Sequence, residues 1–441
     1  MAFVHKPPDP QKLLTRQWRD VATLRRVFDV DVSDGEYLHW DQIRHRDPPG
    51  SLTREEWWAR LKLGRGYTRF PLVGVDGVSA KYSTPPKVLE LLHFIDQHCA
   101  GEIAMEEAVV RDDQVRHRYV VNSLMEEAIR SSQLEGATTS RRRAKQLLES
   151  GDTPADRSEL MIYNNYAAML FVRELGAEIS PQHILELHRV VTDGTLRDPG
   201  AAGRLQLPNE QRVAVYERKP GGRLLHSPPP AEQLPERLEA MCAFANGHRE
   251  DGEFIHPVVR AILLHYWLGY DHPFEDGNGR TARALFYWSM RTQGYWLVEY
   301  LSISRILREA PSAYSNAYLY SETDENDATY FLIHQLEVIR KAVGEMHDYL
   351  NRKVAEVKEV ESLLRSSDEL NHRQIALLSH AMRNADARYS FAGHAASHGV
   401  THETARNDIT ELERRHFLDR RRGGRRHEFL ASPDLHARLR A

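Results

Sequence analysis

The chain has 441 residues, of which 41% are hydrophobic and 28% charged, and its formal net charge is -4. These values exclude a disordered acidic chain and a uniformly basic nucleic-acid coat, and they predict a globular protein with two or three domains. Its two cysteines, Cys99 and Cys242, are expected to be reduced thiols, and no stretch is apolar enough to span a bilayer, so we expect a cytoplasmic protein without membrane contact.

Residues 1–85 are predicted to form a small accessory module whose role the sequence does not reveal. Thr53 and Glu56 have the spacing of a capping box at the start of a helix. Further along, Asp76-Gly77 within FPLVGVDGVSAKY indicates a β-hairpin turn. The aromatic residues of this region are expected in a core.

Residues 86–345 are predicted to form a mainly α domain, because apolar residues recur at helical spacing in KVLELLHFIDQH, RYVVNSLMEEAIRSSQLEG and HPVVRAILLHYWLGY. One segment differs: RVAVYERKPGGRLLHSPPP alternates around Gly221-Gly222, which predicts a β-hairpin. Its first strand is expected over Val213, Ala214, Val215 and Tyr216, and its second over Leu224–His226.

The segment SSQLEG, residues 131–136, predicts the end of a helix, with Gly136 at the position of a C-cap glycine. Glu135 then lies at the negative end of the helix dipole, which is unfavourable for an acid. We therefore expect a positively charged side chain close to Glu135.

The loop DHPFEDGNGRTAR, residues 271–283, carries the strongest functional signal. Gly277 and Gly279 allow backbone conformations in which the N–H groups around Asn278 point to one spot, a nest that binds anions. A helix is predicted to begin directly after this turn, and its positive dipole end favours a phosphate at the same spot.

The charged residues of this loop are those that a reaction at a phosphate needs. Arg280 and Arg283 lie three apart on the first turn of the predicted helix and can face one anion bidentately. Asp276 offers a hard oxygen ligand for Mg²⁺, and His272 can accept a proton near pH 7. The loop thus predicts transfer of a phosphate-bearing group to a nucleophile.

Residues 346–441 are predicted to contain a helical linker and a winged helix-turn-helix, because helix, helix, turn, helix and hairpin follow one another. Ser390 and Thr401 are expected helix caps, with a tight turn at Gly399 between them. The residues expected to contact double-stranded DNA are Arg406 on the recognition helix and Arg421, Arg422, Arg425 and Arg426 on the wing. Docking of a protein partner remains the alternative role for this module.

At every specified position, HPFEDGNGRTAR matches the motif H-x-F-x-[DE]-G-N-G-R-x-x-R, so residues 86–345 resemble the Fic family. The resemblance implies an all-helical Fic fold and transfer of AMP from ATP to a Ser, Thr or Tyr hydroxyl of a target protein. It implies these roles: His272 as general base, Phe274 as core anchor, Asp276 as the Mg²⁺ ligand, Gly277, Asn278 and Gly279 around the α- and β-phosphates, Arg280 on the same phosphates and Arg283 at the γ-phosphate.

Two further segments resemble parts of the same family. Ser131 with Glu135-Gly136 is similar to its inhibitory motif [ST]-x-x-x-E-[GN], which implies that Glu135 pairs with Arg283 and misplaces the nucleotide, as in the class with an N-terminal inhibitory helix. The hairpin at Val213–Tyr216 is similar to the flap that aligns an extended segment of the target by main-chain pairing.

Three alternatives remain open at this point. Glu135 could orient a water, so that the enzyme removes AMP from a modified target. Related domains also transfer other phosphate-containing groups. Alternatively, the chain could be a transcriptional regulator that senses nucleotide, although His272 and Asp276 argue against it because a sensor needs no general base. The oligomeric state is not fixed by the sequence, a homodimer being one alternative.

Overall fold

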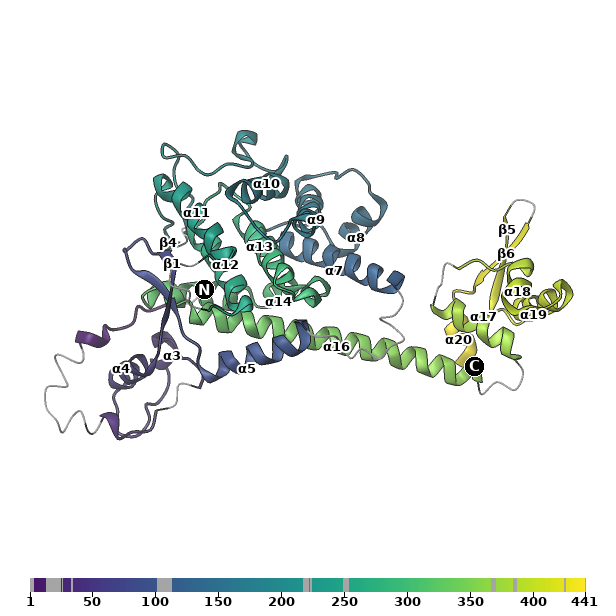
Figure 1. Ribbon diagram of the computed structural model, residues 1–441, viewed down its shortest axis with the longest axis horizontal. Helices are drawn as coiled ribbons and strands as arrows, with labels where there is room; N and C mark the ends of the chain where they lie inside the picture. The colour runs from purple at the N-terminus through teal and green to yellow at the C-terminus, as the bar shows by residue number, and fades with distance from the viewer. Residues whose placement is uncertain are drawn as a thin grey trace. The chain divides into compact units, whose positions relative to one another are not determined.

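The computed structural model describes residues 4–12, 25, 27–32, 35–100, 113–216, 222, 224–248, 254–365, 370–383, 387–423 and 426–440 (Figure 1). The chain divides into two compact units, Met1–Gly344 and Glu345–Ala441. Within the part that the structure describes, helices are either too short or too polar to cross a membrane.

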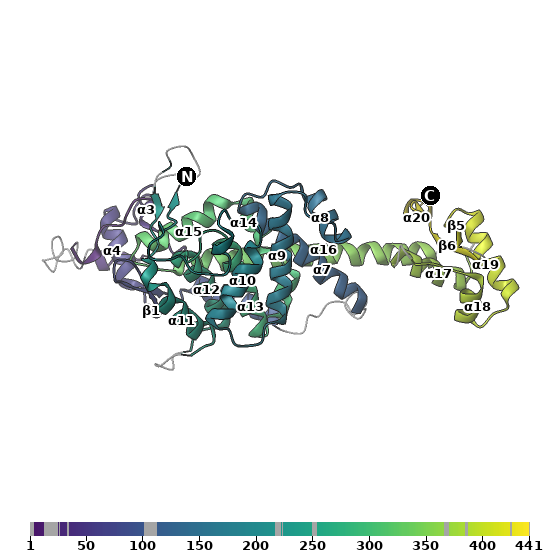
Figure 2. The same cartoon turned by 90° about the horizontal axis from the view of Figure 1, so that it is seen from above.

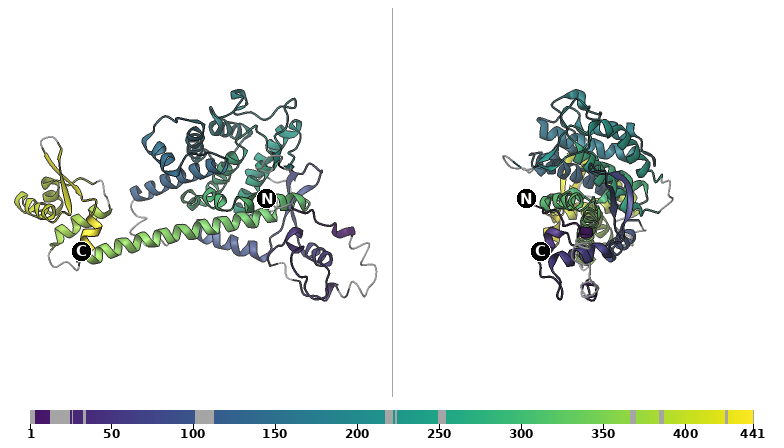
Figure 3. Two further views of the ribbon diagram at one scale, coloured as in Figure 1. Left: turned by 180° about the vertical axis from the view of Figure 1, so that it is seen from behind. Right: turned by 90° about the vertical axis from the view of Figure 1, so that its left-hand side faces the viewer.

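In the N-terminal part of the larger unit, the described elements include the helices α3 (Trp40–Ile43) and α4 (Arg54–Gly64) and a β-hairpin of β1 (Thr68–Val73) and β2 (Ser79–Tyr82). The predicted capping box is confirmed, since Thr53 Oγ1 accepts from Glu56 N and Glu56 Oε2 accepts from Thr53 N. The predicted hairpin is confirmed as well, with β1 antiparallel to β2. These elements lie at the end of the unit away from the helix over residues 141–150 (Figures 2 and 3).

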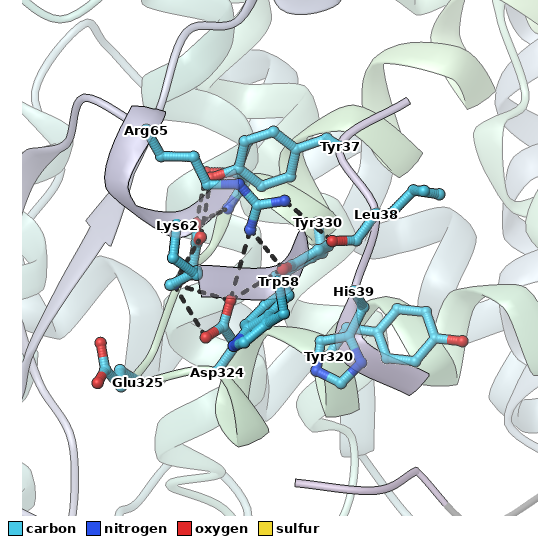
Figure 4. A network of polar contacts seen from close by, with 12 residues as sticks. Tyr37, Leu38, His39, Trp58, Lys62, Arg65, Tyr320, Asp324, Glu325 and Tyr330 are labelled. Carbon is cyan, nitrogen blue, oxygen red and sulfur yellow. Dashed lines mark hydrogen bonds and ion pairs between the residues drawn. The ribbon is translucent and has the colours of Figure 1, made fainter. Parts of the chain in front are cut away.

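A buried ionic network joins this N-terminal part to the helical core (Figure 4). Lys62 and Arg65, from the end of α4, lie 2.9 Å and 3.7 Å from the carboxylate of Asp324. The hydroxyl of Tyr37 donates to Asp327 at 2.8 Å. The side chains of the two cations and two acids are at most 5% exposed, so each charge depends on its partners.

The rest of the larger unit is helical. Its elements are α5 (Pro86–Ile95), η1 (Asp96–Ala100), α7 (Asp113–Leu134), α8 (Arg141–Ser150), α9 (Arg157–Glu174), α10 (Pro181–Thr192), η2 (Pro199–Ala201), η3 (Ala231–Gln233), α11 (Leu234–Ala245), α12 (Pro257–Asp271), α13 (Asn278–Thr292), η4 (Trp296–Tyr300), α14 (Ile303–Glu309), α15 (Pro311–Thr323) and the first part of α16 (Thr329–Arg365), whose residues after Gly344 belong to the smaller unit. Nearly all residues of α12 and α13 are buried, so this pair is the centre of the core and fixes the loop between them.

A short antiparallel hairpin interrupts the helices, with β3 (Val215–Tyr216) paired to β4 (Leu224–His226). Its register places Val215 opposite His226 and Tyr216 opposite Leu224. The predicted first strand was longer: Val213 and Ala214 precede β3 instead of lying in it. Of the predicted turn, Gly221 lies outside the described residues.

The smaller unit contains α17 (His372–Arg383), α18 (Phe391–His398), α19 (His402–Arg414), β5 (Leu418–Gly423), β6 (Arg426–Ala431) and α20 (Leu435–Arg440). The predicted helix caps at Ser390 and Thr401 are confirmed, and Gly399 has the positive φ of 62° that its turn requires. The unit has an apolar core of its own, which comprises Leu370, Leu377, Leu378, Ala381, Ile409, Leu412, Leu418, Phe429 and Leu435.

We expect Asp324→Ala to lower the free energy of unfolding of the larger unit by about 3 kcal/mol or more, because it leaves Lys62 and Arg65 buried without their shared carboxylate. Urea unfolding followed by tryptophan fluorescence measures this change, since all seven tryptophans lie between Met1 and Gly344.

The neighbouring Glu325→Ala is the matched control. Glu325 pairs with Lys81 at 2.7 Å but its side chain is 55% exposed, so its loss should cost less than about 1 kcal/mol. Equal effects of the two substitutions would contradict the role given to the buried network.

Candidate functional site

His272 is the first residue after α12 and has a left-handed backbone, with φ 45° and ψ 52°. Its N–H donates to the carbonyl of Leu268 at 3.0 Å, so the residue closes the helix. This conformation is uncommon outside glycine and costs free energy, and residues held in this way concentrate at functional sites.

The loop after His272 is held by its own side chains. The amide of Asn278 accepts from the N–H of Phe274 at 3.0 Å and donates to the carbonyl of Phe274 at 2.9 Å. Phe274 is fully buried and stacks on the ring of His188, with 3.8 Å between the ring centroids. These two hydrogen bonds fix the side chain of Asn278 against the main chain of Phe274, and the main-chain N–H groups of the turn lie at the start of α13.

His188, on α10, connects the loop to the segment that leads to β3. Its Nδ1 accepts from Gly203 N at 3.0 Å, so its Nε2 carries the proton and donates to the carbonyl of Asp276 at 2.9 Å. Burial lowers the pKa of His188 to about 4, which keeps this neutral tautomer at physiological pH.

The turn at the start of α13 can only be made by glycine. Gly277 has φ 84°, and a Cβ there would lie 2.7 Å from Cγ2 of Thr192. At Gly279 a Cβ would collide with the carboxylate of Glu135. The first N–H groups of a helix lack intrahelical acceptors, so an acid that lies over this turn occupies the spot where an anion is favoured.

Two arginines of α13 are buried beside this turn. Arg280 is fully buried; its Nη1 donates to the carbonyl of Val191 at 2.9 Å and its Nη2 lies 3.6 Å from Asp276 Oδ1. Within the described part of the chain, Nε and Nη2 of Arg280 and Nη1 of Arg283 make no hydrogen bond. Buried donors of this kind call for an acceptor, so the site is suited to a multiply charged oxyanion.

The cation that the sequence required beside Glu135 is Arg283. Its Nη2 lies 2.8 Å from Glu135 Oε1, and its Nε donates to the hydroxyl of Ser131 at 2.9 Å. Burial alone would lower the pKa of Arg283, but the charge and hydrogen bond of Glu135, with smaller contributions from Tyr314 and Glu127, outweigh burial together, and the pKa is raised. The ion pair thus joins the end of α7 to the first turn of α13. Gly136 has the positive φ of 103° that a glycine allows at a helix end.

Helix α7 is itself firmly attached to its neighbours. Buried Glu127 accepts from Ser304 N at 3.0 Å and from the hydroxyl of Ser302 at 2.9 Å. Ser132 donates to the carbonyl of Met161 at 3.1 Å, and Asn165 donates to that of Ala128. Glu135 is therefore presented from a fixed helix.

The imidazole of His272 is uncharged at neutral pH. Burial lowers its pKa to about 4, and the nearby His226 adds to the effect. Its Nδ1 contacts the carbonyl of Gly269 at 3.4 Å, which assigns the ring proton to Nδ1 and leaves Nε2 as an acceptor. A neutral imidazole of this kind can take a proton from a hydroxyl.

Asp276 is half-exposed at the edge of the same turn. Its Oδ1 accepts from Gly277 N at 2.6 Å, and its Oδ2 lies 3.0 Å from Nη2 of Arg157. The described residues contain no cluster of three or more His, Cys, Asp and Glu side chains suited to a metal. A single carboxylate fits Mg²⁺ when the remaining ligands come from phosphate and water, as in a magnesium nucleotide.

The structure brings His272, Asp276–Arg280 and Arg283 together with Ser131 and Glu135. The predicted DNA contacts belong to the smaller unit, where Arg406 and Arg421 are exposed on α19 and β5. Arg425 and the side chains of Arg422 and Arg426 lie outside the described residues. The residues that contact the loop or its helix end and that sequence reasoning missed include Arg157, His188, Arg212, His226 and Arg237.

Comparisons with known proteins concern the region around this loop. Residues 178–290 match the model of the Fic/DOC family. "Protein adenylyltransferase fic-1" of Caenorhabditis elegans is 34% identical over 170 residues, which cover 37% of this chain and 30% of that protein. "Protein adenylyltransferase Fic" of Nematostella vectensis is 37% identical over 107 residues, 24% of this chain and 22% of that protein. The chain therefore spans less than a third of the length of these relatives.

Two solved structures are similar in fold. A Fic family protein from Desulfovibrio desulfuricans G20 has a TM-score of 0.53 at 18% identity, with 80% of this chain and 98% of that chain covered. Fic-1 from Caenorhabditis elegans has a TM-score of 0.50 at 21% identity, with 80% and 89% covered. These likenesses confirm the predicted mainly helical Fic fold.

We expect the His272 imidazole to titrate near pH 4 in an NMR titration, with His272→Asn to assign its resonance. The unfolded chain, with a histidine pKa of about 6.5, binds this proton more readily, so stability falls as the pH drops from about 6.5 towards 4, by up to about 3 kcal/mol for this residue. A midpoint at or above 6.5 would contradict the burial of a neutral ring.

Proposed function

We propose, from the Fic/DOC domain that this chain carries at residues 178–290, that the protein is an adenylyltransferase which moves AMP from ATP to a hydroxyl side chain of a target protein. The curated relatives are adenylyltransferases by name, and they support the activity for the matched region. The observation that carries the proposal is the pair of buried guanidinium groups, Arg280 and Arg283, whose unpaired N–H donors lie beside a glycine turn and a neutral histidine.

In the proposed reaction the triphosphate lies over the start of α13. The N–H groups around Gly277 and Gly279 and the guanidinium of Arg280 neutralise the α- and β-phosphates, and Arg283 binds the γ-phosphate. Asp276 would hold Mg²⁺, which neutralises phosphate charge when bound. Arg157 has to release one oxygen of Asp276 for this, because the two side chains pair at 3.0 Å.

His272 then supplies the proton acceptor. Its Nε2 takes the proton from the incoming Ser, Thr or Tyr hydroxyl, whose oxygen forms a bond to the α-phosphorus. The bond from that phosphorus to the bridging oxygen breaks, and pyrophosphate leaves with the bonding electrons. AMP is thereby joined to the target through a phosphodiester, and the nest stabilises the charge on the phosphate oxygens during the transfer.

The target segment is proposed to pair with the hairpin at Val213–Tyr216. In the described residues β3 and β4 form a sheet of only two strands, so an outer edge remains available for an added strand. Tyr216 and Leu224, 57% and 49% exposed, offer apolar contacts to such a segment.

Glu135 is proposed to inhibit the reaction. Its carboxylate lies over Gly279 and pairs with Arg283, so it takes the place and the partner that a terminal phosphate needs. A nucleotide that enters must either displace this acid or bind with its α-phosphate out of line with the attacking hydroxyl. Ser131 supports the brake because its hydroxyl orients Arg283.

DNA binding by the smaller unit is a second proposal. It is supported by the order of α17 to α19 and the β5–β6 hairpin, which is that of a winged helix-turn-helix, and by exposed Arg406 and Arg421. Buried Asp408 accepts from Arg373 at 2.7 Å and from Asn371 at 2.8 Å, which fixes α19 against α17. A recognition helix requires this kind of rigid support.

In this test, protein is incubated with ATP that is labelled on its α-phosphate, and the label transferred to protein is measured. We expect Glu135→Gly to raise this transfer about tenfold or more, because the phosphate no longer competes with a fixed acid for Arg283. Adding His272→Ala should abolish the labelling while calorimetry still detects uptake of Mg-ATP.

Glu126→Gly, on the same helix, is the matched control: its carboxylate pairs with Arg130 and Arg141 instead of Arg283 and should not release activity. Unchanged labelling in Glu135→Gly, or persistent labelling without His272, would remove the proposed mechanism.

For the smaller unit we expect affinity for double-stranded DNA to fall linearly with salt on a logarithmic scale, as fluorescence anisotropy measures. Replacing Arg421, Arg422, Arg425 and Arg426 by Ala should reduce that slope by about three to four, because each phosphate contact contributes about 0.9. Arg438→Ala, on α20, is the control and should leave the slope unchanged; a slope that is already flat in the parent would exclude DNA binding.

A further inference from the structure

His226, the last residue of β4, has both ring nitrogens against oxygen atoms that can only accept. Nδ1 lies 2.8 Å from Oε2 of Glu322 on α15, and Nε2 lies 2.6 Å from the carbonyl oxygen of Tyr270 on α12. A neutral imidazole has one N–H, whereas an imidazolium has two. The geometry therefore requires the charged form, with Glu322 as its counter-ion.

The surroundings of His226 support the same charge. Burial of this side chain, which is 7% exposed, disfavours the imidazolium, but hydrogen bonding and charge attraction from Glu322 outweigh it, and the pKa is raised. Asp271 at the end of α12 contributes in the same direction. The effect on the neighbouring His272 runs the other way, since the charge of His226 helps to lower the pKa of the His272 ring.

The contact of His226 with Tyr270 lies at the turn of α12 that carries His272. Other segments hold the same turn: Arg212 donates to the carbonyl of Asp271 at 2.7 Å, and Arg237 donates to the Asp271 carboxylate at 2.9 Å. On the far side, the hydroxyl of Tyr270 accepts from Val75 N at 3.0 Å. Two of these contacts come from the two ends of the hairpin: Arg212 precedes β3, and His226 is the last residue of β4.

We propose that His226, as an imidazolium, is a positioning residue that fixes β4 against the last turn of α12 and so sets the hairpin in register with His272. The proposal rests on the adenylyl transfer proposed above. It assigns His226 a second effect through charge: a positive ring near His272 opposes protonation of that ring and keeps it available as the proton acceptor. Glu322 maintains both effects because it keeps His226 charged.

The charge of His226 can be observed without any reaction. Nitrogen NMR of protein with ¹⁵N-labelled histidine should show two bound protons on the His226 ring at pH 7, assigned with His226→Gln. Glu322→Gln should lower the pH at which one of these protons is lost. A ring with a single proton at pH 7 would overturn the proposal.

The positioning role is measured in the Glu135→Gly background with α-labelled ATP and a cell lysate as the source of acceptor proteins. We expect His226→Gln to lower protein labelling by about tenfold, the size of one charge-assisted hydrogen bond, with the affinity for Mg-ATP unchanged in calorimetry. In the His226→Gln variant, the fall of the labelling rate on the acidic side should begin at higher pH, because His272 has lost a positive neighbour and takes up a proton more readily. In Glu322→Gln the fall on the alkaline side should begin at lower pH, because His226 loses its proton earlier.

His98→Asn is the control for a partly buried histidine, because His98, in η1, contacts the carbonyl of Phe94 at the end of α5 and has no part in the proposed site. A loss in His226→Gln that is equal at every pH would indicate a structural role only and overturn the charge effect. No uptake of Mg-ATP in the Glu135→Gly parent would overturn the proposed function and with it the positioning role, whereas undiminished labelling by His226→Gln in a parent that labels would overturn the positioning role alone.

Discussion

The guanidinium of Arg283 is the group on which the rest of the site depends. It is buried inside the helix pair at the centre of the core, and a cation in such a place requires an anion beside it. In the structure that anion is Glu135, and in the proposed reaction it is a phosphate of the nucleotide. The ion pair between Glu135 and Arg283 therefore stabilises the resting protein and, in the proposed reaction, opposes the transfer. The packing of α7 on α13 and the control of activity depend on the same contact.

The chemistry is proposed for a few side chains, but the geometry of these side chains is set by other residues, several of which hold the backbone of the loop. Asn278 encloses the main chain of Phe274, and His188 holds the carbonyl of Asp276. The last turn of α12 is bound from α11, from β4 and from the N-terminal hairpin. Catalysis by orientation needs this kind of support, because small displacements of the acceptor histidine change the line of attack.

The sequence predicted most of the helices and the reactive loop because both depend on local patterns. Apolar spacing marks α12, and the glycines, the histidine and the two arginines of the loop lie within thirteen residues. The need for a cation at Glu135 followed from the helix dipole, although its identity as Arg283 came from the family resemblance. His188, Arg212 and His226 were not found, since each acts on residues about 45 to 90 positions away and none carries a local signal. The first strand was predicted too long because the apolar run begins at Val213, two residues before the paired residues Val215 and Tyr216.

The buried network of Lys62, Arg65, Asp324 and Asp327 makes the first 85 residues inseparable from the domain that follows. A shortened chain that began at Pro85 would leave two acids facing water without their cations, next to the start of α16. We therefore expect a segment exchanged between homologous chains to fold well only when both halves of the charge pattern come from the same parent, so the two regions should change together in evolution.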